Sequence, residues 1–582
     1  MIKMNNPHIY KRIFKEIRPY TLYVILSVLL GAAGVAASLY SPILIGRAVD
    51  FIVGEGNVNF TEIGKLFITV GIMIAVFSVS QWLMTVINNK ISYGVVKSVR
   101  RQAFDKIQKM PISYLDSHSS GDTVSRIIND SEAFGDGLII GFGQLFTGIL
   151  TIVGTFFFMV YIDYRITLFV VLITPLSLFV AKYISSKTYS MFKQRSEIRA
   201  EQTSFINEMV GNQKVVQAYT HEDENEEKFY EISKRLEKSS LKAIFYSSIT
   251  NPVTRFINSV CYAGVALIGA FAVIGGDGAL TVGMLFSLLS YAGQYAKPFN
   301  EITGVVTEFQ NAYACAGRVF ELVDQPGISD KTDTVPISNL KADIKFNNVE
   351  FSYTPDKPLI RNVNLDIKSG TRVAIVGPTG CGKTTLINLL MRFYDVTGGS
   401  ITLDGTDIRD ISRSELRHNI GMVLQDTWLS NKSVRDNIAM GRPGASDEEI
   451  KAAAKASHAH SFIKRLPDGY DTLVGEGGAP LSQGQKQLLC ISRVMLAPPP
   501  ILILDEATSS IDTRTEMLIR SAFMKLTEGR TSFVVAHRLS TIRNSDIILV
   551  MKDGNIIESG DHEELLKKGG FYKELYESQY KF

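Results

Sequence analysis

The chain has 582 residues, which is too long for one ordinary domain and predicts at least two. Its formal net charge of +3 is small for this length and provides no basic field suited to nucleic acid, which is excluded as an expected partner. A hydrophobic content of 46% and a mean hydropathy of +0.11 are high for a soluble protein, and four widely spaced cysteines indicate neither a disulfide framework nor a zinc site.

Six apolar stretches in the N-terminal half are predicted to cross a membrane. A membrane-spanning helix needs about 20 mostly apolar residues. The stretches cover residues 21–45, 67–87, 138–162, 166–184, 256–274 and 282–296, of which the last is short. Six in succession favour a membrane domain over the alternative, a set of buried helices in a large soluble core. The first follows a basic start, but its length and the five later stretches favour a retained helix over a signal peptide.

Basic residues are distributed unequally between the segments that join these stretches. Segments 53–60 and 275–279 contain no Lys or Arg, whereas the long segments after the second and fourth stretches are rich in both. Lys and Arg are retained on the cytoplasmic side of a membrane. We therefore expect a multi-pass protein in the lipid bilayer of the cell (plasma) membrane, with both termini, the two long segments and the C-terminal half in the cytoplasm.

The two long segments, each of roughly 50 to 70 residues, are charged but helical in pattern. Unstructured loops of this length are uncommon in compact proteins. We expect the membrane helices to continue into the cytoplasm as two helical hairpins, with tips near residues 114–118 and 217–222. The tips are either solvated turns or elements that dock onto the C-terminal half.

Polar side chains within the spans are few, namely Gln81, Gln144, Asn258 and Gln294. They could line a route for a ligand, or they could hydrogen-bond one helix to another. The absence of a fully charged residue deep in the spans favours an apolar or amphipathic ligand over a small ion.

A composition break at residues 323–330 separates the apolar half from a half in which short β runs alternate with helical segments to about residue 554. This alternation predicts an α/β domain with a largely parallel sheet. The expected fold is an N-terminal all-α transmembrane domain of six helices with long cytoplasmic helical extensions, followed by a C-terminal α/β domain. We assign residues 1–322 to the first domain, 323–341 to a linker and 342–582 to the second.

Residues 377–385 match G-x-x-x-x-G-K-[ST], the loop that wraps nucleotide phosphates, and lie between a short apolar strand and a helix. Glycines allow the tight curl that turns backbone N–H groups toward one anion, and this predicts a P-loop ATPase domain. Lys383 is expected to reach the β- and γ-phosphates and Thr384 to hold Mg²⁺. The alternative is a glycine-rich turn. The predicted nucleotide-binding residues of the loop are Gly377, Pro378, Thr379, Gly380, Cys381, Gly382, Lys383, Thr384 and Thr385.

Other polar residues of this half lie at the ends of apolar runs. Asp505 and Glu506 end one run, where the first carboxylate could hold Mg²⁺ and the second could polarise an attacking water. Gln425 and His537 end two further runs, where the amide could sense the metal and the imidazole could bond a γ-phosphate. Tyr353 offers a ring on which adenine can stack. Singly, the last three could equally be a surface amide, a helix-cap histidine and a strand-end aromatic.

The motif Leu481-Ser-Gln-Gly-Gln485 precedes a helix-like segment, so Ser482 and Gly484 would offer donors to another phosphate. Together with the six spans and the polar residues above, this motif resembles the ATP-binding cassette (ABC) transporters over nearly the whole chain. Within that family the chain is similar to a type IV exporter half-transporter, which has six spans followed by one nucleotide-binding domain.

The resemblance implies a role for each of these residues. Glu506 would be the catalytic base, acting with His537 and Gln425. The Mg²⁺ ion would be held by Thr384, Gln425 and Asp505. The residues that contact ATP would be Tyr353, those of the phosphate loop, Ser482, Gly484 and Gln485 of the signature motif, and Asp512.

The resemblance also implies that one chain is half of a complete transporter and pairs with a second half-transporter chain. The activity would be ATP hydrolysis coupled to transmembrane movement, with ATP and Mg²⁺ as cofactors. Hydrophobic or amphipathic small molecules, of the multidrug kind, would be exported by alternating access. The alternatives are a lipid or peptide translocator of the same family, and a nucleotide-sensing regulator that does not pump.

One position departs from the family pattern. The signature motif has Gln483 where the family has glycine, and a longer side chain there could weaken the site built with it. Similar signatures occur in one member of bacterial heterodimeric exporters, and the C-terminal residues 569–580 resemble that subgroup. We therefore favour a heterodimer over a homodimer.

Overall fold

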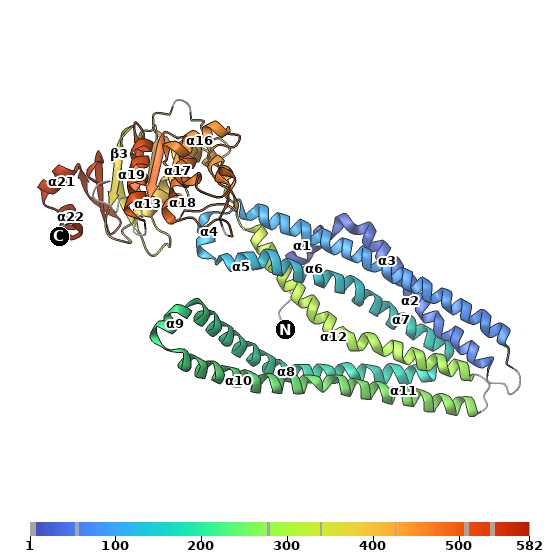
Figure 1. Ribbon diagram of the computed structural model, residues 1–582. Coiled ribbons are helices and arrows are strands. Elements are labelled where there is room, and N and C mark those ends of the chain that lie inside the picture. The colour runs from blue at the N-terminus through green and yellow to red at the C-terminus, as the bar shows by residue number, and fades with distance from the viewer. Residues whose placement is uncertain are drawn as a thin grey trace. The chain divides into compact units, whose positions relative to one another are not determined.

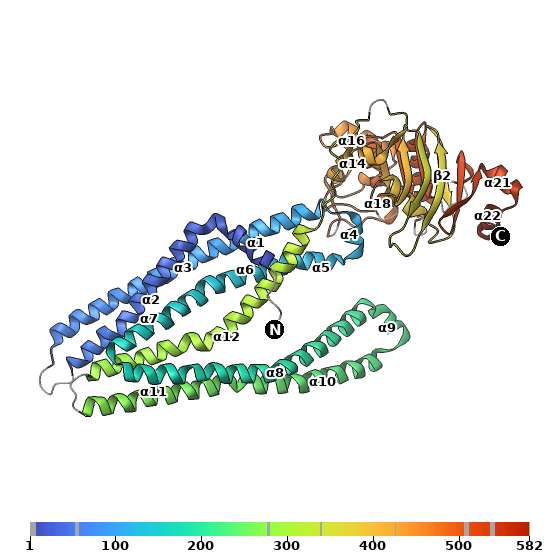
Figure 2. The same cartoon turned by 180° about the vertical axis from the view of Figure 1, so that it is seen from behind.

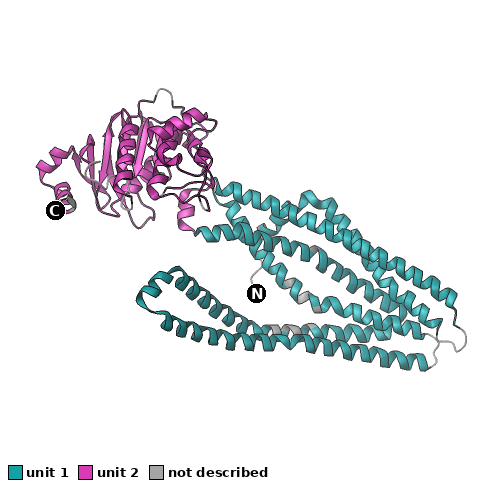
Figure 3. Ribbon diagram, viewed as in Figure 1, with its two compact units in different colours: residues 1–109, 119–326 teal, residues 110–118, 327–582 magenta. Residues whose placement is uncertain are grey.

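The computed structural model describes residues 7–52, 58–275, 280–337, 340–424, 427–475, 477–505, 511–535 and 542–580. The chain divides into two compact units (Figure 3). Unit 1 contains Met1–Lys109 and Ser119–Pro326, and unit 2 contains Met110–His118 and Gly327–Phe582. The short segment Met110–His118 therefore belongs to the same unit as the C-terminal half of the chain.

Unit 1 is helical. Its helices are α1 (Pro7–Ile17), α2 (Thr21–Asp50), α3 (Phe60–Ile107), α5 (Ser120–Ser125), α6 (Ser131–Ile140), α7 (Phe146–Ile162), α8 (Tyr164–Gly211), α9 (Gln213–Tyr219), α10 (Glu222–Ser248), α11 (Thr250–Ile274) and α12 (Val282–Asp324). Two π-helical turns, Arg126–Asp130 and Gly141–Leu145, connect α5 to α6 and α6 to α7. Helix α12 reaches two residues into the segment that the composition break suggested as the linker.

All six stretches predicted to cross a membrane are helical. Within the described residues, four helical segments are long and apolar enough to span a bilayer, namely Ile9–Asp50, Phe60–Ile107, Ser120–Ile162 and Glu222–Ile274. The fourth predicted stretch contains a shorter apolar helix, Tyr164–Ser177. The sixth predicted stretch forms the start of α12, where Ser287, Tyr291 and Gln294 lower the mean hydropathy. It is neither one of the four long apolar segments nor the shorter apolar helix.

The second long segment forms the expected helical hairpin. Helix α8 continues far beyond its apolar part, α9 makes the tip, and α10 runs back beside α8 (Figures 1 and 2). A Gln202–Ser233 hydrogen bond of 2.9 Å and a Glu201–Arg235 ion pair of 2.6 Å join the two helices. These polar contacts join the hairpin in addition to the packing of the buried Ile232 and Ala243 of α10.

Helices α2 and α12 approach closely through glycine. A Cβ atom added to Gly46 would lie 2.3 Å from the Gly283 carbonyl oxygen, so only glycine fits at this crossing. The Asp50 carboxylate at the end of α2 accepts hydrogen bonds from the Gly283 N–H and the Thr281 hydroxyl, each 2.8 Å long. The end of α2 thereby satisfies free donors at the start of α12.

Unit 2 contains two main sheets. The first has the order β2-β1-β4-β5 and is antiparallel; the second has the order β12-β11-β3-β10-β9-β6 and is parallel except at β12. The strands are β1 (Ile344–Phe351), β2 (Ile360–Ile367), β3 (Arg372–Val376), β4 (Gly398–Leu403), β5 (Thr406–Asp407), β6 (Ile420–Val423), β7 (Lys432–Ser433), β8 (Leu473–Val474), β9 (Ile501–Asp505), β10 (Thr531–Val535), β11 (Ile547–Lys552) and β12 (Asn555–Gly560). The α/β class is confirmed, with an additional antiparallel sheet.

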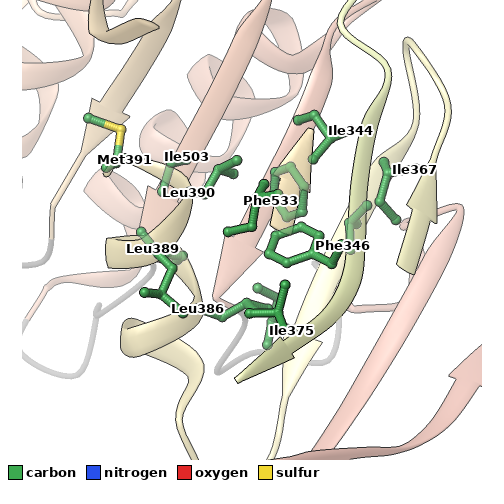
Figure 4. Packing of buried hydrophobic residues seen from close by; sticks show 14 of the residues in the cluster. Ile344, Phe346, Ile367, Ile375, Leu386, Leu389, Leu390, Met391, Ile503 and Phe533 are labelled. Carbon is green, nitrogen blue, oxygen red and sulfur yellow. The ribbon is translucent and has the colours of Figure 1, made fainter. Parts of the chain in front are cut away.

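Helices surround these sheets. They are α4 (Ile112–Ser117), α13 (Lys383–Leu390), α14 (Arg413–His418), α15 (Val434–Ala439), α16 (Asp447–Ala456), α17 (His460–Ile463), α18 (Gln483–Leu496), α19 (Thr513–Thr527), α21 (His562–Lys568) and α22 (Phe571–Tyr580). Helix α13, directly after the phosphate loop, packs its buried Leu386 and Leu389 in a core with Phe346 of β1 and Phe533 of β10 (Figure 4). This core fixes the position of the helix that the loop precedes.

Candidate nucleotide-binding site

The carboxyl ends of four adjacent parallel strands lie at one edge of the larger sheet. The register pairs Val535 of β10 with both Ile375 of β3 and Asp505 of β9, and Val423 of β6 with Leu504 of β9. Ligands of open α/β sheets bind beyond this edge. The phosphate loop follows β3 here, and Asp505 is the last residue of β9.

Three predicted site residues lie outside the described residues. These are Gln425, Glu506 and His537. Each comes within two residues of the end of a strand in this row, β6, β9 or β10. The sheet therefore brings together the strands that lead to them.

The phosphate loop has a backbone that glycine makes possible. Gly377, Gly380 and Gly382 have φ angles of 154°, 82° and 104°, a region that other residues rarely adopt. A Cβ atom on Gly377 would also lie 2.2 Å from the Met551 carbonyl oxygen. The loop is exposed at Pro378, Thr379 and Gly380, whereas Cys381 is buried. The loop therefore packs closely against β11, and its exposed residues 378–380 are accessible to a ligand.

Lys383 crosses the base of this loop. Its ammonium group donates hydrogen bonds to the carbonyl oxygens of Gly377 (2.9 Å) and Pro378 (3.0 Å), and the residue is only 7% exposed. Within the described part of the chain, no carboxylate forms an ion pair with it. A buried cation is costly unless it is compensated. The loop therefore fits the phosphates of ATP, whose negative charge Lys383 would meet together with the N–H groups at the start of α13.

The two threonines after Lys383 have different surroundings. Thr384 is exposed, so its hydroxyl is accessible to a metal ion beside a bound phosphate. Thr385 is buried, and its hydroxyl lies 3.2 Å from the hydroxyl of Tyr353. This contact joins the aromatic residue predicted to stack on adenine to the helix that begins at the phosphate loop.

Tyr353 belongs to an aromatic cluster. Its ring is 49% exposed and meets Phe351 and Tyr394 edge to face, with centroid distances of 4.9 and 5.0 Å. Edge-to-face packing fixes the ring while leaving part of it open to solvent. The open part can stack on adenine, as the sequence predicts.

The signature motif forms the start of α18. The Ser482 hydroxyl accepts from the Gln485 N–H (3.3 Å), and the Gln485 side chain accepts in return from the Ser482 N–H (3.0 Å), which makes a capping box. The Ser482 hydroxyl keeps its own proton to donate to a phosphate. Gln483 is exposed at the first helical position. The motif thus presents donors outward from a rigid helix end.

Gly484 connects the signature motif to the segment that contains Asp512. A Cβ atom on Gly484 would lie 2.4 Å from the Thr515 side chain, so α18 and α19 are in close contact here. Asp512 caps α19 by accepting from the Thr515 N–H (2.9 Å), which lowers the pKa of this carboxyl. The structure thereby places Ser482, Gly484, Gln485 and Asp512 in one group at the starts of α18 and α19, whose buried residues belong to a different core cluster from those of α13.

No motif in the sequence indicates that Tyr394 lies beside Tyr353. Tyr394 lies just beyond α13, and its hydroxyl donates to the Asp116 carboxylate of α4. Burial and the hydrogen bond to Asp116 raise the pKa of Tyr394, which keeps the phenol protonated as a donor. In α4 itself, Tyr114 and His118 stack with centroids 4.0 Å apart. The tip at residues 114–118 is therefore a docking element, not a solvated turn.

Comparison with known proteins supports both halves of the chain. Residues 24–299 match the family model of the ABC transporter transmembrane region, and residues 360–509 match that of the ABC transporter domain. A Mycobacterium bovis protein, the fatty acid ABC transporter ATP-binding/permease protein, is 38% identical over 91% of this chain and 82% of its own length. YgaD, a Bacillus subtilis ATP-binding/permease protein named for multidrug export, is 36% identical over 98% and 99%.

A solved structure has the same fold throughout. It is a bacterial Atm1-family ABC exporter with ATP bound, with a TM-score of 0.78, 28% sequence identity, and coverage of 97% of this chain and 99% of that one. The chain belongs to the ABC transporter family, and it has the arrangement of a type IV exporter half-transporter. It is thus an ATP-binding, ATP-hydrolysing membrane transporter.

Proposed function

We propose that this chain is one half of a pump that exports hydrophobic or amphipathic compounds, of the multidrug kind, by alternating access. The observation that carries this proposal is the position of α4. This helix lies in the chain between α3 and the membrane-length helical segment Ser120–Ile162, yet it belongs to the same compact unit as the phosphate loop (Figure 3). A movement of the nucleotide domain would therefore be transmitted directly to the cytoplasmic ends of two membrane helices.

The same proposal assigns the hydrolytic residues. Glu506 is the general base, and His537 contacts the γ-phosphate. Thr384, Gln425 and Asp505 would hold Mg²⁺, which would supply positive charge beside the phosphates of ATP. The exposed hydroxyl of Thr384 and the position of Asp505 at the end of β9 support this assignment.

A second chain is required to complete each ATP site. In one chain the phosphate loop and Tyr353 form one group, while Ser482, Gly484, Gln485 and Asp512 form another on α18 and α19. We propose that ATP lies between the first group of one chain and the second group of its partner. Gln483, exposed at the start of α18, favours a heterodimer in which the two ATP sites are unequal. A chain purified alone as a stable, fully active dimer would contradict the heterodimer.

We propose that both termini and unit 2 are cytoplasmic, as the distribution of basic residues suggests. Single cysteines introduced at positions 55 and 277, in a variant without the four native cysteines, should react with an impermeant maleimide on intact cells. A cysteine introduced at position 355 should react only after lysis. The reverse pattern would contradict this orientation.

The test of the pump is ATPase activity in lipid. The purified assembly, reconstituted in liposomes, should hydrolyse ATP in a vanadate-sensitive reaction, and Glu506→Gln should slow it by about 10²- to 10⁴-fold, as expected for loss of a general base. Absence of vanadate-sensitive activity, or no effect of Glu506→Gln, would contradict the proposal. A non-pumping regulator would instead bind ATP without steady turnover.

A lipid substrate is the second candidate. The name of the Mycobacterium bovis relative specifies fatty acid, an amphipathic compound. Stimulation of ATPase activity by a panel of drugs and a panel of lipids, compared at equal concentrations, separates the two substrate classes.

A further inference from the structure

A pocket of about 600 Å³ lies between α11 and α12 in unit 1. We propose that this pocket binds the acidic head group of an amphiphile, which names a substrate class for the exporter and rests on the function proposed above. Its polar lining consists of Arg255, Asn258, Ser259 and Tyr262 on α11, and Lys297 and Glu301 on α12. The other lining residues have small side chains or none, namely Cys261, Ala292, Gly293 and Ala296.

The spacing of these residues places them on two facing helix surfaces. Residues 255, 258, 259 and 262 recur at the three- and four-residue intervals of one helix face, and Lys297 and Glu301 are four residues apart on the other helix. Gly293 lies one turn before Lys297, and a Cβ atom there would meet nothing within 4 Å. The space beside Gly293, between the two rows of polar side chains, is therefore open.

The charges in the pocket are not compensated within the protein. Neither Arg255 nor Lys297 forms an ion pair or a side-chain hydrogen bond with any residue that the structure describes. Elsewhere in unit 1, Arg318 and Arg126 are each paired with carboxylates. Two cations and one carboxylate, Glu301, leave the pocket with a net positive charge. A ligand with a single negative charge complements it, and the hydroxyls of Ser259 and Tyr262 and the amide of Asn258 add donors.

The position of the pocket fits a molecule that sits partly in the bilayer. Arg255 directly precedes the fifth predicted span and Lys297 directly follows the sixth, so both lie at its expected cytoplasmic boundary. Phe286 is exposed on α12 and lies seven residues before Gly293, on the same helix face, where an acyl chain can lie. An acidic head group in the pocket and an apolar chain along this face of α12 satisfy both surfaces. Simple anchoring of the spans by bulk lipid would need the two cations but not the pocket and its hydroxyls.

The experiment compares an acid with its methyl ester, which has the same acyl chain but no charge. Palmitate and methyl palmitate share a chain, and their binding to the purified assembly in lipid nanodiscs is measured with radiolabelled compounds. Palmitate should bind at least about tenfold more tightly than the ester, since a charge-assisted hydrogen bond contributes about this factor. Hexadecyl phosphate serves as a second acid, and the tighter of the two acids identifies a carboxylate or a phosphate as the preferred head group.

Variants then test whether Arg255 and Lys297 account for the tighter binding of the charged ligand. Arg255→Gln and Lys297→Gln should each weaken palmitate binding about tenfold and leave methyl palmitate binding unchanged, which also shows that the variants fold. Lys242→Gln, an exposed cation of α10 outside the pocket, should leave the binding of both compounds unchanged. Equal binding of acid and ester, or equal palmitate binding by Arg255→Gln, Lys297→Gln and Lys242→Gln, would overturn the inference.

The same preparation separates the two proposals. Vanadate-sensitive ATPase activity with charge-independent palmitate binding would reject the pocket and leave the pump intact. Charge-dependent binding without ATPase activity would reject the pump and leave the pocket as a lipid site.

Discussion

The hydroxyl of Tyr394 donates a hydrogen bond to the carboxylate of Asp116, and these two residues are 278 positions apart in the chain. Tyr394 also packs edge to face on Tyr353, whose hydroxyl lies beside that of Thr385 in α13. A continuous set of contacts therefore runs from the predicted adenine-stacking ring to helix α4. Chains of packed side chains and hydrogen bonds of this kind can carry coupling between two sites, and the energetic share of this one can be measured.

We predict that Tyr394→Phe reduces transport more than ATP hydrolysis. The substitution keeps the ring packing and removes one hydrogen bond to a carboxylate that is exposed, so the loss is about 1 kcal/mol or roughly fivefold. The ratio of exported compound to hydrolysed ATP measures the effect. A double-mutant cycle with Asp116→Ala provides the control, because the two changes should not be additive if the bond carries the coupling. Additive effects would refute this role for the pair.

We predict that Tyr353→Ala weakens nucleotide binding by about ten- to a hundredfold, the usual contribution of stacking between a base and an aromatic ring. Tyr353→Phe keeps the ring and loses only the contact with Thr385, so it should bind nearly as well as the unmodified protein. Nucleotide affinity measured by fluorescence titration distinguishes the two variants. If Tyr353→Phe and Tyr353→Ala weakened nucleotide binding equally, the hydroxyl of Tyr353 and not its ring would hold the nucleotide.

We predict that Gly377→Ala destabilises unit 2 and abolishes nucleotide binding. The φ of 154° is unfavourable for alanine, and the added methyl group would meet the Met551 carbonyl. Gly529→Ala is the matched control, because Gly529 also has a positive φ, 69°, but open space around it. The control should cost about 1–2 kcal/mol from backbone strain alone and should still bind nucleotide. Thermal unfolding and nucleotide titration test both variants, and a Gly377→Ala protein that binds ATP normally would contradict the account.

We predict that Gln483→Gly raises the ATPase turnover of the assembly. Gln483 is exposed at the first position of α18, where a smaller residue allows a phosphate closer to the Ser482 hydroxyl and the helix N-terminus. Gln483→Ala is an intermediate control and should give an intermediate rate. Unchanged or lower turnover in Gln483→Gly would show that the glutamine does not limit the site.

The sequence predicted those features that depend on local pattern. Hydropathy located the six helices, and the G-x-x-x-x-G-K-T motif located the loop whose glycines adopt positive φ and whose Lys383 is buried. Strand β3 (Arg372–Val376) also ends directly before this loop, where the sequence predicts a short apolar strand. Each of these features arises from residues close together in the chain, where periodicity and spacing carry the information.

The features that the sequence missed depend on contacts between distant segments. Nothing near Tyr394 indicates that its partner is Asp116, because the contact joins segments 278 residues apart. Arg255 and Lys297 flank two spans and have the pattern of ordinary membrane anchors, and only the facing of α11 and α12 places them in one pocket. The roles of Glu506, His537 and Gln425 remain predictions that mutagenesis has to test.

The most direct test of the pump is transport into inside-out vesicles that contain the purified assembly. With ATP and Mg²⁺ outside, a fluorescent amphiphile should accumulate in the lumen, and Glu506→Gln should reduce the accumulation to the level seen without ATP. Steady ATP hydrolysis by the unmodified protein, with no amphiphile of either substrate class crossing the membrane, would contradict the account.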